Sequence, residues 1–251
     1  MARMDLLRSN LINTTTSVTG TSNLAGFAQY LFDRNLNFRY ATSGYTSNTT
    51  AVLSWVFASP QVISHVLLQN HNLRDFRLYY NSVTANSLLI TTTNSATSTY
   101  VSFASTTVSS VDLQMNAPIT GDNEKAVGEW VLSDRLYQFS NNPTAQNYDP
   151  QANMHRILHR MPDGGVAAFI IKNKYKAKLS LDYISTTSRD TLLSIYNSTP
   201  TFYFLPEPTA TGWEGFAREV LWTNPFNFTW GENSKTQGFN GEIVLEETSN
   251  A

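Results

Sequence analysis

Four histidines are the side chains of this sequence best suited to acid-base chemistry or metal binding. His155 and His159 stand four residues apart and would share one face of a helix, as paired zinc ligands do. The residues around them do not form HExxH, and the segment fits a strand equally well. His71 follows an apolar stretch within Asn70–Leu73, where histidine and asparagine suit turn geometry. The histidines therefore predict no metal site, and we expect His71 in a turn.

No other reactive set is recognisable. The chain has no cysteine and no GxSxG motif, and its carboxylates are scattered among expected strands. Asp163, Gly164 and Gly165 lack the context of a phosphate-binding loop and predict a turn. We therefore expect a non-catalytic protein without a cofactor. A glycan hydrolase or esterase is the least favoured function because no acid, base or nucleophile can be named.

The composition favours β structure and disfavours charged partners. Charged residues make up 14% of the chain, and serine, threonine and asparagine together make up roughly a third of it. These polar residues suit strand faces and turns. A net charge of -2 predicts no nucleic-acid partner, and no stretch is apolar enough for a signal peptide or a membrane helix. We expect folding in the cytoplasm and no membrane contact.

Two β domains are predicted. Short apolar segments separated by turn residues indicate an antiparallel β-sandwich over 1–138, and a polar stretch with two prolines indicates a linker or loop over 139–153. The second domain, over 154–251, is expected to carry one helix at about 188–198 with Ser188 as its N-cap. The strands are expected at 51–57, 62–68, 76–80, 87–91, 99–103, 111–115, 127–132, 166–171, 176–184, 201–205, 217–222, 226–230 and 241–246.

One residue of the expected linker is singled out as an interface residue. Ordering a dozen polar residues costs on the order of 1 kcal/mol or more for each residue in backbone entropy. Tyr148 is the one large side chain that could offset this cost. We expect it to lie against another subunit or the partner domain.

The segment Tyr30–Ala41, with the sequence YLFDRNLNFRYA, resembles the "LFDGNxxTxW" opening of discoidin-like sandwiches of the galactose-binding fold. The strand order that follows, to about Leu136, is also similar to theirs. The resemblance implies a jelly-roll sandwich with ligand-binding loops at one end. Asp33 and Asn35 match its turn and would be ligand-binding residues, while Arg34 stands where the motif has glycine.

Similar sandwiches, preceded by a sequence like that of Asn70–Leu73, occur as structural modules in the tails of phages and gene-transfer agents. The second domain resembles, in the order of its elements, the split β-barrel with a flanking helix of tail-tube and distal-tail proteins. These resemblances imply a structural protein of the virion tail. It would form a homo-oligomeric ring, expected to be hexameric, with other tail or baseplate proteins as partners. The alternative is a carbohydrate-binding module for glycans of the host surface. The exposure of Phe38, Tyr40 and Tyr45 tests this alternative, because buried rings there would leave no surface on which a sugar could stack.

Overall fold

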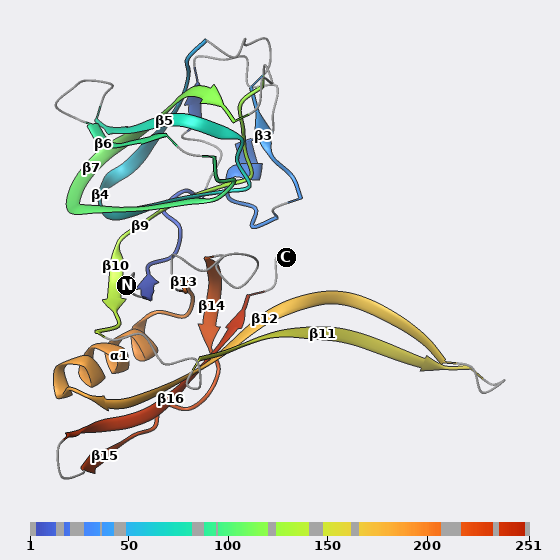
Figure 1. Ribbon diagram of the computed structural model, residues 1–251, viewed down its shortest axis with the longest axis vertical. Coiled ribbons are helices and arrows are strands. Elements are labelled where there is room, and N and C mark those ends of the chain that lie inside the picture. Colours follow the sequence, from blue (N-terminus) through green and yellow to red (C-terminus); the bar gives the residue numbers. More distant parts are fainter. Residues whose placement is uncertain are drawn as a thin grey trace. The chain divides into compact units, whose positions relative to one another are not determined.

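The computed structural model divides the chain into two compact units (Figure 1). The inserted unit is Ser9–Arg135, and the discontinuous unit joins Met1–Arg8 to Leu136–Ser249. Both consist of antiparallel strands, and the described residues contain a single α-helix. The predicted mainly-β fold is thereby confirmed.

Some segments are not described. The structure describes 4–13, 18–20, 28–35, 37–42, 49–81, 88–93, 95–119, 124–140, 148–161, 166–206, 217–232 and 236–248. Within these ranges only the backbone is described for 18–20, 88–92, 152–159 and 166–173. The expected turn at Asp163–Gly165 and the aromatic residue Tyr45 lie outside the described residues.

The division into units differs from the boundaries drawn on the sequence. Strand β1 (Asp5–Leu7) pairs with β13 (Phe202–Leu205) and so belongs to the discontinuous unit. The inserted unit accordingly begins at Ser9 rather than at the first residue, and it ends at Arg135 rather than at 138. No local pattern could reveal this, because the partner of β1 lies about two hundred residues along the chain.

Long bent strands build the inserted unit. Strand β4 (Ala51–Gln69) pairs with β7 (Thr99–Pro118) along most of its length, and each covers two of the strands expected from sequence. The register shifts between Val56 and Gln61, so Pro60 lies where no ladder hydrogen bond is needed from its nitrogen. The unit's other elements are β2 (Val18–Gly20), η2 (Ala28–Leu31), β3 (Tyr40–Ala41), β5 (Leu73–Tyr80), β6 (Leu88–Thr93), β8 (Ala126–Val127) and β9 (Glu129–Ser133).

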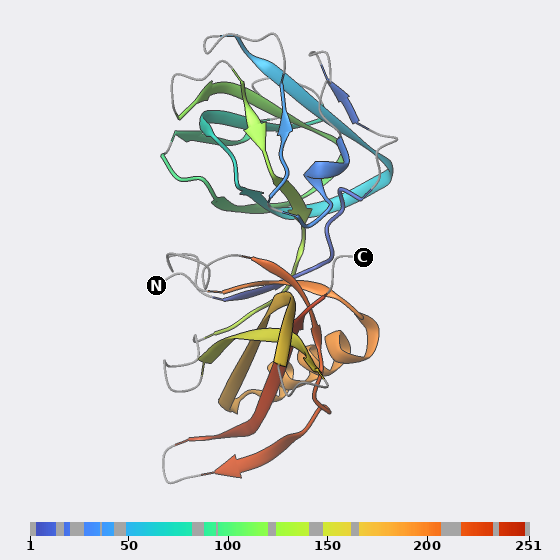
Figure 2. The same cartoon turned by 90° about the vertical axis from the view of Figure 1, so that its right-hand side faces the viewer.

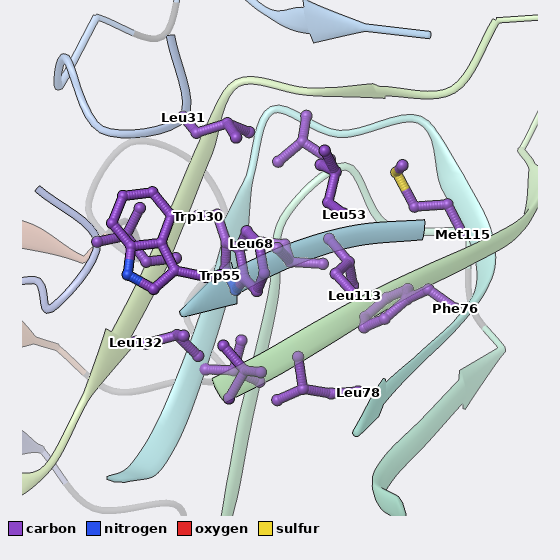
Figure 3. Packing of buried hydrophobic residues seen from close by; sticks show 14 of the residues in the cluster. Leu31, Leu53, Trp55, Leu68, Phe76, Leu78, Leu113, Met115, Trp130 and Leu132 are labelled. Carbon is purple, nitrogen blue, oxygen red and sulfur yellow. The ribbon is translucent and has the colours of Figure 1, made fainter. Parts of the chain in front are cut away.

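Alternation along these strands fills one apolar core (Figure 3). Val111, Leu113 and Met115 of β7 are buried in it, as the strict alternation of this strand predicts. Trp130 of β9 is its largest fully buried side chain. The core also holds Leu31 and Tyr40, which flank the segment where the sequence suggests a ligand site.

The discontinuous unit is an eight-stranded antiparallel sheet with one helix. Its path runs β10-β1-β13-β14-β16-β12-β11, with β15 paired to β16. On β12 the residues Tyr175, Ala177 and Leu179 face the core, whereas Lys176 and Lys178 point to the other face. The bounds of the strands not yet given are β10 (Arg135–Gln138), β11 (Tyr148–Arg160), β12 (Val166–Ile184), β14 (Arg218–Trp222), β15 (Phe228–Glu232) and β16 (Gln237–Glu247).

The helix α1 (Thr186–Ser198) covers one face of this sheet (Figures 1 and 2). Its Leu192 and Ile195 are buried in the core of the unit, as the predicted apolar stripe requires. The helix ends as expected, but its N-cap is Ser185, whose hydroxyl accepts a hydrogen bond from the Ser188 amide. The sequence places the N-cap at Ser188 because both serines precede the stripe at plausible distances.

The stretch expected as a linker contains the start of a strand. β11 begins at Tyr148, so the part of 139–153 from that residue onward pairs with β12. Pro150 is compatible with this because β11 is an edge strand, whose outer side requires no amide donor. Strands β11 and β12 pair antiparallel as a hairpin, on either side of the segment where the sequence predicts a turn.

Candidate ligand-binding face

In the described part of the inserted unit, only one aromatic pair has a half-exposed ring, and that pair lies on a short turn. Tyr30 and Phe38 stack with ring centroids 5.2 Å apart and planes 15° from parallel. Phe38 is 50% exposed, and Tyr30 is partly exposed. The rings therefore present a flat apolar surface to solvent, which is the shape that stacks on a planar or ring-shaped ligand.

Two buried anchors hold this surface in place. Leu31 precedes the turn and Tyr40 follows it, and both side chains are fully buried in the core. Tyr40 also pairs through its backbone with Val127 of β8. Phe32 packs edge-on against Trp55 with centroids 6.1 Å apart. The turn is thus fixed at both ends, which lowers the entropy that a ligand would otherwise have to overcome.

Side chains of the turn fix its backbone. Asp33 Oδ1 accepts a hydrogen bond from the Asn35 amide at 2.8 Å, and Asn35 Oδ1 accepts one from the Asn37 amide at 3.2 Å. The Phe38 amide donates to the Asn35 carbonyl at 3.1 Å. Arg34 takes a φ of 60°, the left-handed geometry for which the discoidin motif uses glycine. The chain therefore forms this turn with an arginine at the strained position.

Burial raises the pKa of the Asp33 carboxyl above its ordinary value, and the hydrogen bond from the Asn35 backbone acts in the opposite direction. Asp33 and Asn35, the two residues suggested by the resemblance, are brought together by the turn. Their described hydrogen bonds stabilise the turn itself, and their direct contact with a ligand stays a prediction. The three aromatic residues whose exposure tests glycan binding differ from one another. Phe38 is exposed, Tyr40 is buried, and Tyr45 is outside the described residues.

A serine, a histidine and an aspartate meet elsewhere in the inserted unit, a cluster that the sequence did not reveal. Ser64 Oγ donates to Asp134 Oδ1 at 2.8 Å and lies 2.9 Å from His65 Nδ1. Arg135 Nη2 lies 3.2 Å from His65 Nε2. A guanidinium only donates, so Nε2 accepts and the imidazole proton sits on Nδ1, facing the serine.

This arrangement is not a catalytic triad. In a triad the carboxylate orients the histidine, and the histidine accepts the proton of the serine. Here the carboxylate accepts directly from Ser64, and Nδ1 of His65 has no free lone pair for the serine proton. Both Ser64 and His65 are also buried. The cluster instead ties β4 to Asp134 and Arg135, where the inserted unit ends.

The remaining histidines have structural surroundings or lie in strands. His71 occupies the predicted turn between β4 and β5, where Nδ1 accepts from the Leu73 amide at 3.1 Å and Nε2 lies 2.9 Å from Thr99 Oγ1. His155 and His159 are in β11 rather than a helix, and their side chains are outside the described part. No group of metal-binding side chains occurs among the described residues.

Tyr148 is placed within its own unit. Its hydroxyl lies 2.7 Å from that of Tyr175, and its ring packs edge-on against Phe204 at 6.3 Å. The side chain remains partly exposed. A contact of Tyr148 with another subunit stays a prediction.

No helix among the described residues is long and apolar enough to span a membrane.

Several solved carbohydrate-binding modules are similar to part of the chain. Chitosan-binding module 1 of a chitosanase/glucanase from Paenibacillus sp. IK-5 is 18% identical, with a TM-score of 0.43, over 50% of this chain and 98% of the module. The family 32 module of Streptococcus pneumoniae EndoD is 14% identical, with a TM-score of 0.41, over 50% and 99%. The module CpGH89CBM32-5 from Clostridium perfringens, in complex with GalNAc-β-1,3-galactose, is 15% identical, with a TM-score of 0.39, over 46% and 92%.

No protein-family profile matches the chain. No curated protein matches it in sequence either. With TM-scores below 0.5, the structural similarities do not assign a ligand to this chain. The fold, in contrast, is read directly from the strands: the inserted unit is an antiparallel β-sandwich and the whole chain is mainly β.

Proposed function

We propose that the inserted unit is a non-catalytic carbohydrate-binding module and that the stacked Tyr30–Phe38 pair is its binding surface. The observation that carries this proposal is the half-exposed Phe38 ring, held parallel to Tyr30 on a turn anchored at both ends. A single exposed apolar side chain is ordinary, but the Phe38 ring is held in a fixed orientation beside a second ring, and this flat paired surface favours a role in binding.

The chemistry around the rings suits a sugar. The apolar C–H face of a pyranose packs on an aromatic ring, while its hydroxyls require polar partners at the rim. Arg34 and Arg39 are both exposed on the same turn and can donate several hydrogen bonds. An uncharged glycan can use these donors without an opposite charge, in agreement with the low overall charge of the chain.

The test is binding of purified protein to a glycan array, followed by titration with the strongest hit and with chitotriose. Replacing Phe38→Ala is expected to weaken binding by roughly tenfold or more, because the ring supplies most of the contact area. Val62→Ala is the matched control, since Val62 is an exposed apolar residue of the same unit that lies outside the turn. A blank array, or equal affinity in the Phe38→Ala variant, contradicts the proposal.

A second function is favoured by a separate observation: we propose that the whole chain is a structural component of a multi-copy assembly, a ring in a phage tail at the distal tail, baseplate or tube. Among the strands that the structure describes, β11 and the first half of β12 pair only with each other. An isolated two-stranded ribbon is marginally stable in water, which favours its burial against another molecule. In this function the protein resides in the virion tail, and tail neighbours are its partners.

Mass photometry and negative-stain imaging of the full chain, alone and with tail particles, test this second function. Rings or discrete oligomers are expected at micromolar concentration. A chain that remains monomeric and never joins a particle contradicts it.

A further inference from the structure

The hairpin of β11 and β12 extends as an arm from the sheet of the discontinuous unit (Figure 1). We define the arm as Ala152–Arg160 and Val166–Tyr175. The pairing of β16 with β12 begins at Lys176, so no strand in the described ranges pairs with the arm as a third strand. The outer edge of β11 is also unpaired by any described strand. Its backbone donors and acceptors are therefore available to another chain.

The arm is cationic. It contains Arg156, Arg160, Lys172 and Lys174 and no carboxylate. The rest of the discontinuous unit contains seven lysines or arginines and twelve carboxylates. Where β12 lies beside β16, Lys176 and Lys178 pair with Glu246 and Glu242. The arm extends beyond the part of β12 that pairs with β16, so these two glutamates of β16 lie beside the base of the sheet and not beside the arm.

The other end of the same sheet is acidic and carries an exposed tryptophan. We define the acidic end as Asp182–Asp190, Phe228–Glu232 and Gln237–Asn240. The segment between the last two ranges also carries Lys235, which lies outside the described residues. Asp182, Asp190 and Glu232 are exposed there. Among its described residues Arg189 is the one cation, and its guanidinium is bonded to Asp190 and lies 4.9 Å from the Phe239 ring centroid.

Trp230 gives this end an anchor for a partner. It pairs with Phe239 of β16, which in turn pairs with Ile184 of β12, so one row crosses three strands. The Trp230 ring packs edge-on against Phe239 at 5.1 Å and is 56% exposed. It is thus held rigid and open to solvent, as interface anchors are.

We infer that the arm of one copy docks on the acidic end of the next copy, with the arm cations facing Asp182, Asp190 and Glu232 and with Trp230 packed against the arm. The two surfaces cannot meet within one copy, because β12 connects them as a continuous strand of 19 residues, about 60 Å long. Figure 1 shows α1 and β15 at the end of the sheet opposite the arm.

Such a contact is head-to-tail, so it generates a closed ring or an open filament. The inference rests on the proposed assembly and names the surfaces that would form it. It also accounts for the ribbon: the neighbour covers the strands that its own sheet leaves uncovered. Opposite charge on the two surfaces gives the contact its orientation and disfavours arm-to-arm pairing.

Sedimentation velocity of the full chain over a range of concentrations and salt tests the inference. Two double variants are compared, Lys172→Glu/Lys174→Glu in the arm and Asp190→Lys/Glu232→Lys in the acidic end. Each is expected to raise the dissociation constant by roughly tenfold or more, because like charges then face each other. Combining all four substitutions restores opposite charges and is expected to restore assembly. Raising the salt concentration is expected to weaken the wild-type assembly.

The matched control is the double variant Arg74→Glu/Arg77→Glu, the same charge change on exposed residues of the inserted unit, which should leave assembly unchanged. Circular dichroism melting verifies that each variant is folded. If the wild type assembles and all variants assemble equally, the arm inference is overturned while the assembly proposal stands. If the wild type is monomeric under every condition, both are overturned. Restoration in the fourfold variant supports the inference even where a twofold variant has lost some stability.

Discussion

The inserted and discontinuous units use the same antiparallel strands but complete their structures differently. In the inserted unit, polar side chains that are buried or partly buried join distant parts of the chain. Asn10 bonds the backbone of β9, His71 bonds the turn after β4, and Ser64 bonds Asp134. In the discontinuous unit a ribbon extends beyond the sheet and a tryptophan stands exposed. The comparison suggests that the first is complete alone and presents a ligand surface, while the second is completed by another copy.

The largest effect on this comparison is expected from the core of the inserted unit. Replacing Trp130→Ala should lower the free energy of unfolding of this unit by about 3–5 kcal/mol, because a fully buried indole leaves a cavity that packed strands cannot close. Urea denaturation followed by fluorescence and circular dichroism measures the loss. Glycan binding should fall with it, whereas assembly should persist.

Trp130→Phe is the matched control. The indole Nε1 has no hydrogen-bond partner in the described part of the chain, so phenylalanine removes volume without leaving a polar group unpaired. It should cost less than alanine. If Trp130→Ala abolished assembly as well as glycan binding, the two units would not be independent in function, and the comparison would fail.

Acid should weaken the inserted unit through His71. Burial lowers the pKa of this imidazole from its ordinary 6.5 to about 4, against the opposing effect of its bond to the Leu73 amide. The unfolded chain therefore takes up a proton at a higher pH than the folded one. Stability is highest above pH 6.5 and is lost as the pH falls toward 4, by about 3 kcal/mol in total.

Urea denaturation at a series of pH values measures this loss. His71→Gln lacks the titrating group and should show a flatter dependence between pH 6.5 and 4, at the cost of lower stability near pH 7. Equal pH dependence in both proteins would mean that His71 is protonated in the folded state without penalty. That outcome would remove His71 from the groups that close the inserted unit.

The parts that sequence predicted well are those set by local periodicity. The alternation in Val111–Met115 and the apolar stripe around Leu192 both gave the correct buried face, because each depends only on neighbours two to four residues away. The turn at Asp33 and Asn35 was likewise found from a local motif. β1 was missed because its partner, β13, is distant in sequence.

The site residues that were missed share the same cause. The sequence points to Phe38 as a candidate stacking residue but not to its partner Tyr30, which is eight residues away and reaches Phe38 only through the turn with Arg34 at positive φ. The exposure of Trp230 does not follow from the sequence, because a strand pattern does not show which edge or face of the strand another element will cover. The proline-bearing stretch was taken as a linker, because its polar pattern hides an edge strand that begins at Tyr148.

The smallest expected effect concerns the helix of the discontinuous unit, and it tests whether this unit is completed by another copy. Ser185 is the N-cap of α1, and its Oγ accepts from the Ser188 amide at 3.1 Å. Ser185→Ala leaves that amide without its side-chain partner and should lower the free energy of unfolding of this unit by about 1 kcal/mol. Ser185→Asp is the matched control, because aspartate caps as well as serine and its charge favours the helix N-terminus.

The readout of this last substitution separates local stability from assembly. Ser185 lies next to Ile184, at the acidic end that we infer to receive the arm of the next copy. If the neighbour's arm covers this end, it can supply an acceptor for the Ser188 amide that Ser185→Ala leaves unpaired. Part of the loss seen in dilute monomer should then disappear at concentrations where the protein is oligomeric. Melting temperatures of both variants at low and high concentration test this. An identical loss at every concentration of an assembling protein would show that the acidic end stays open, and the neighbour's arm would then have to dock elsewhere.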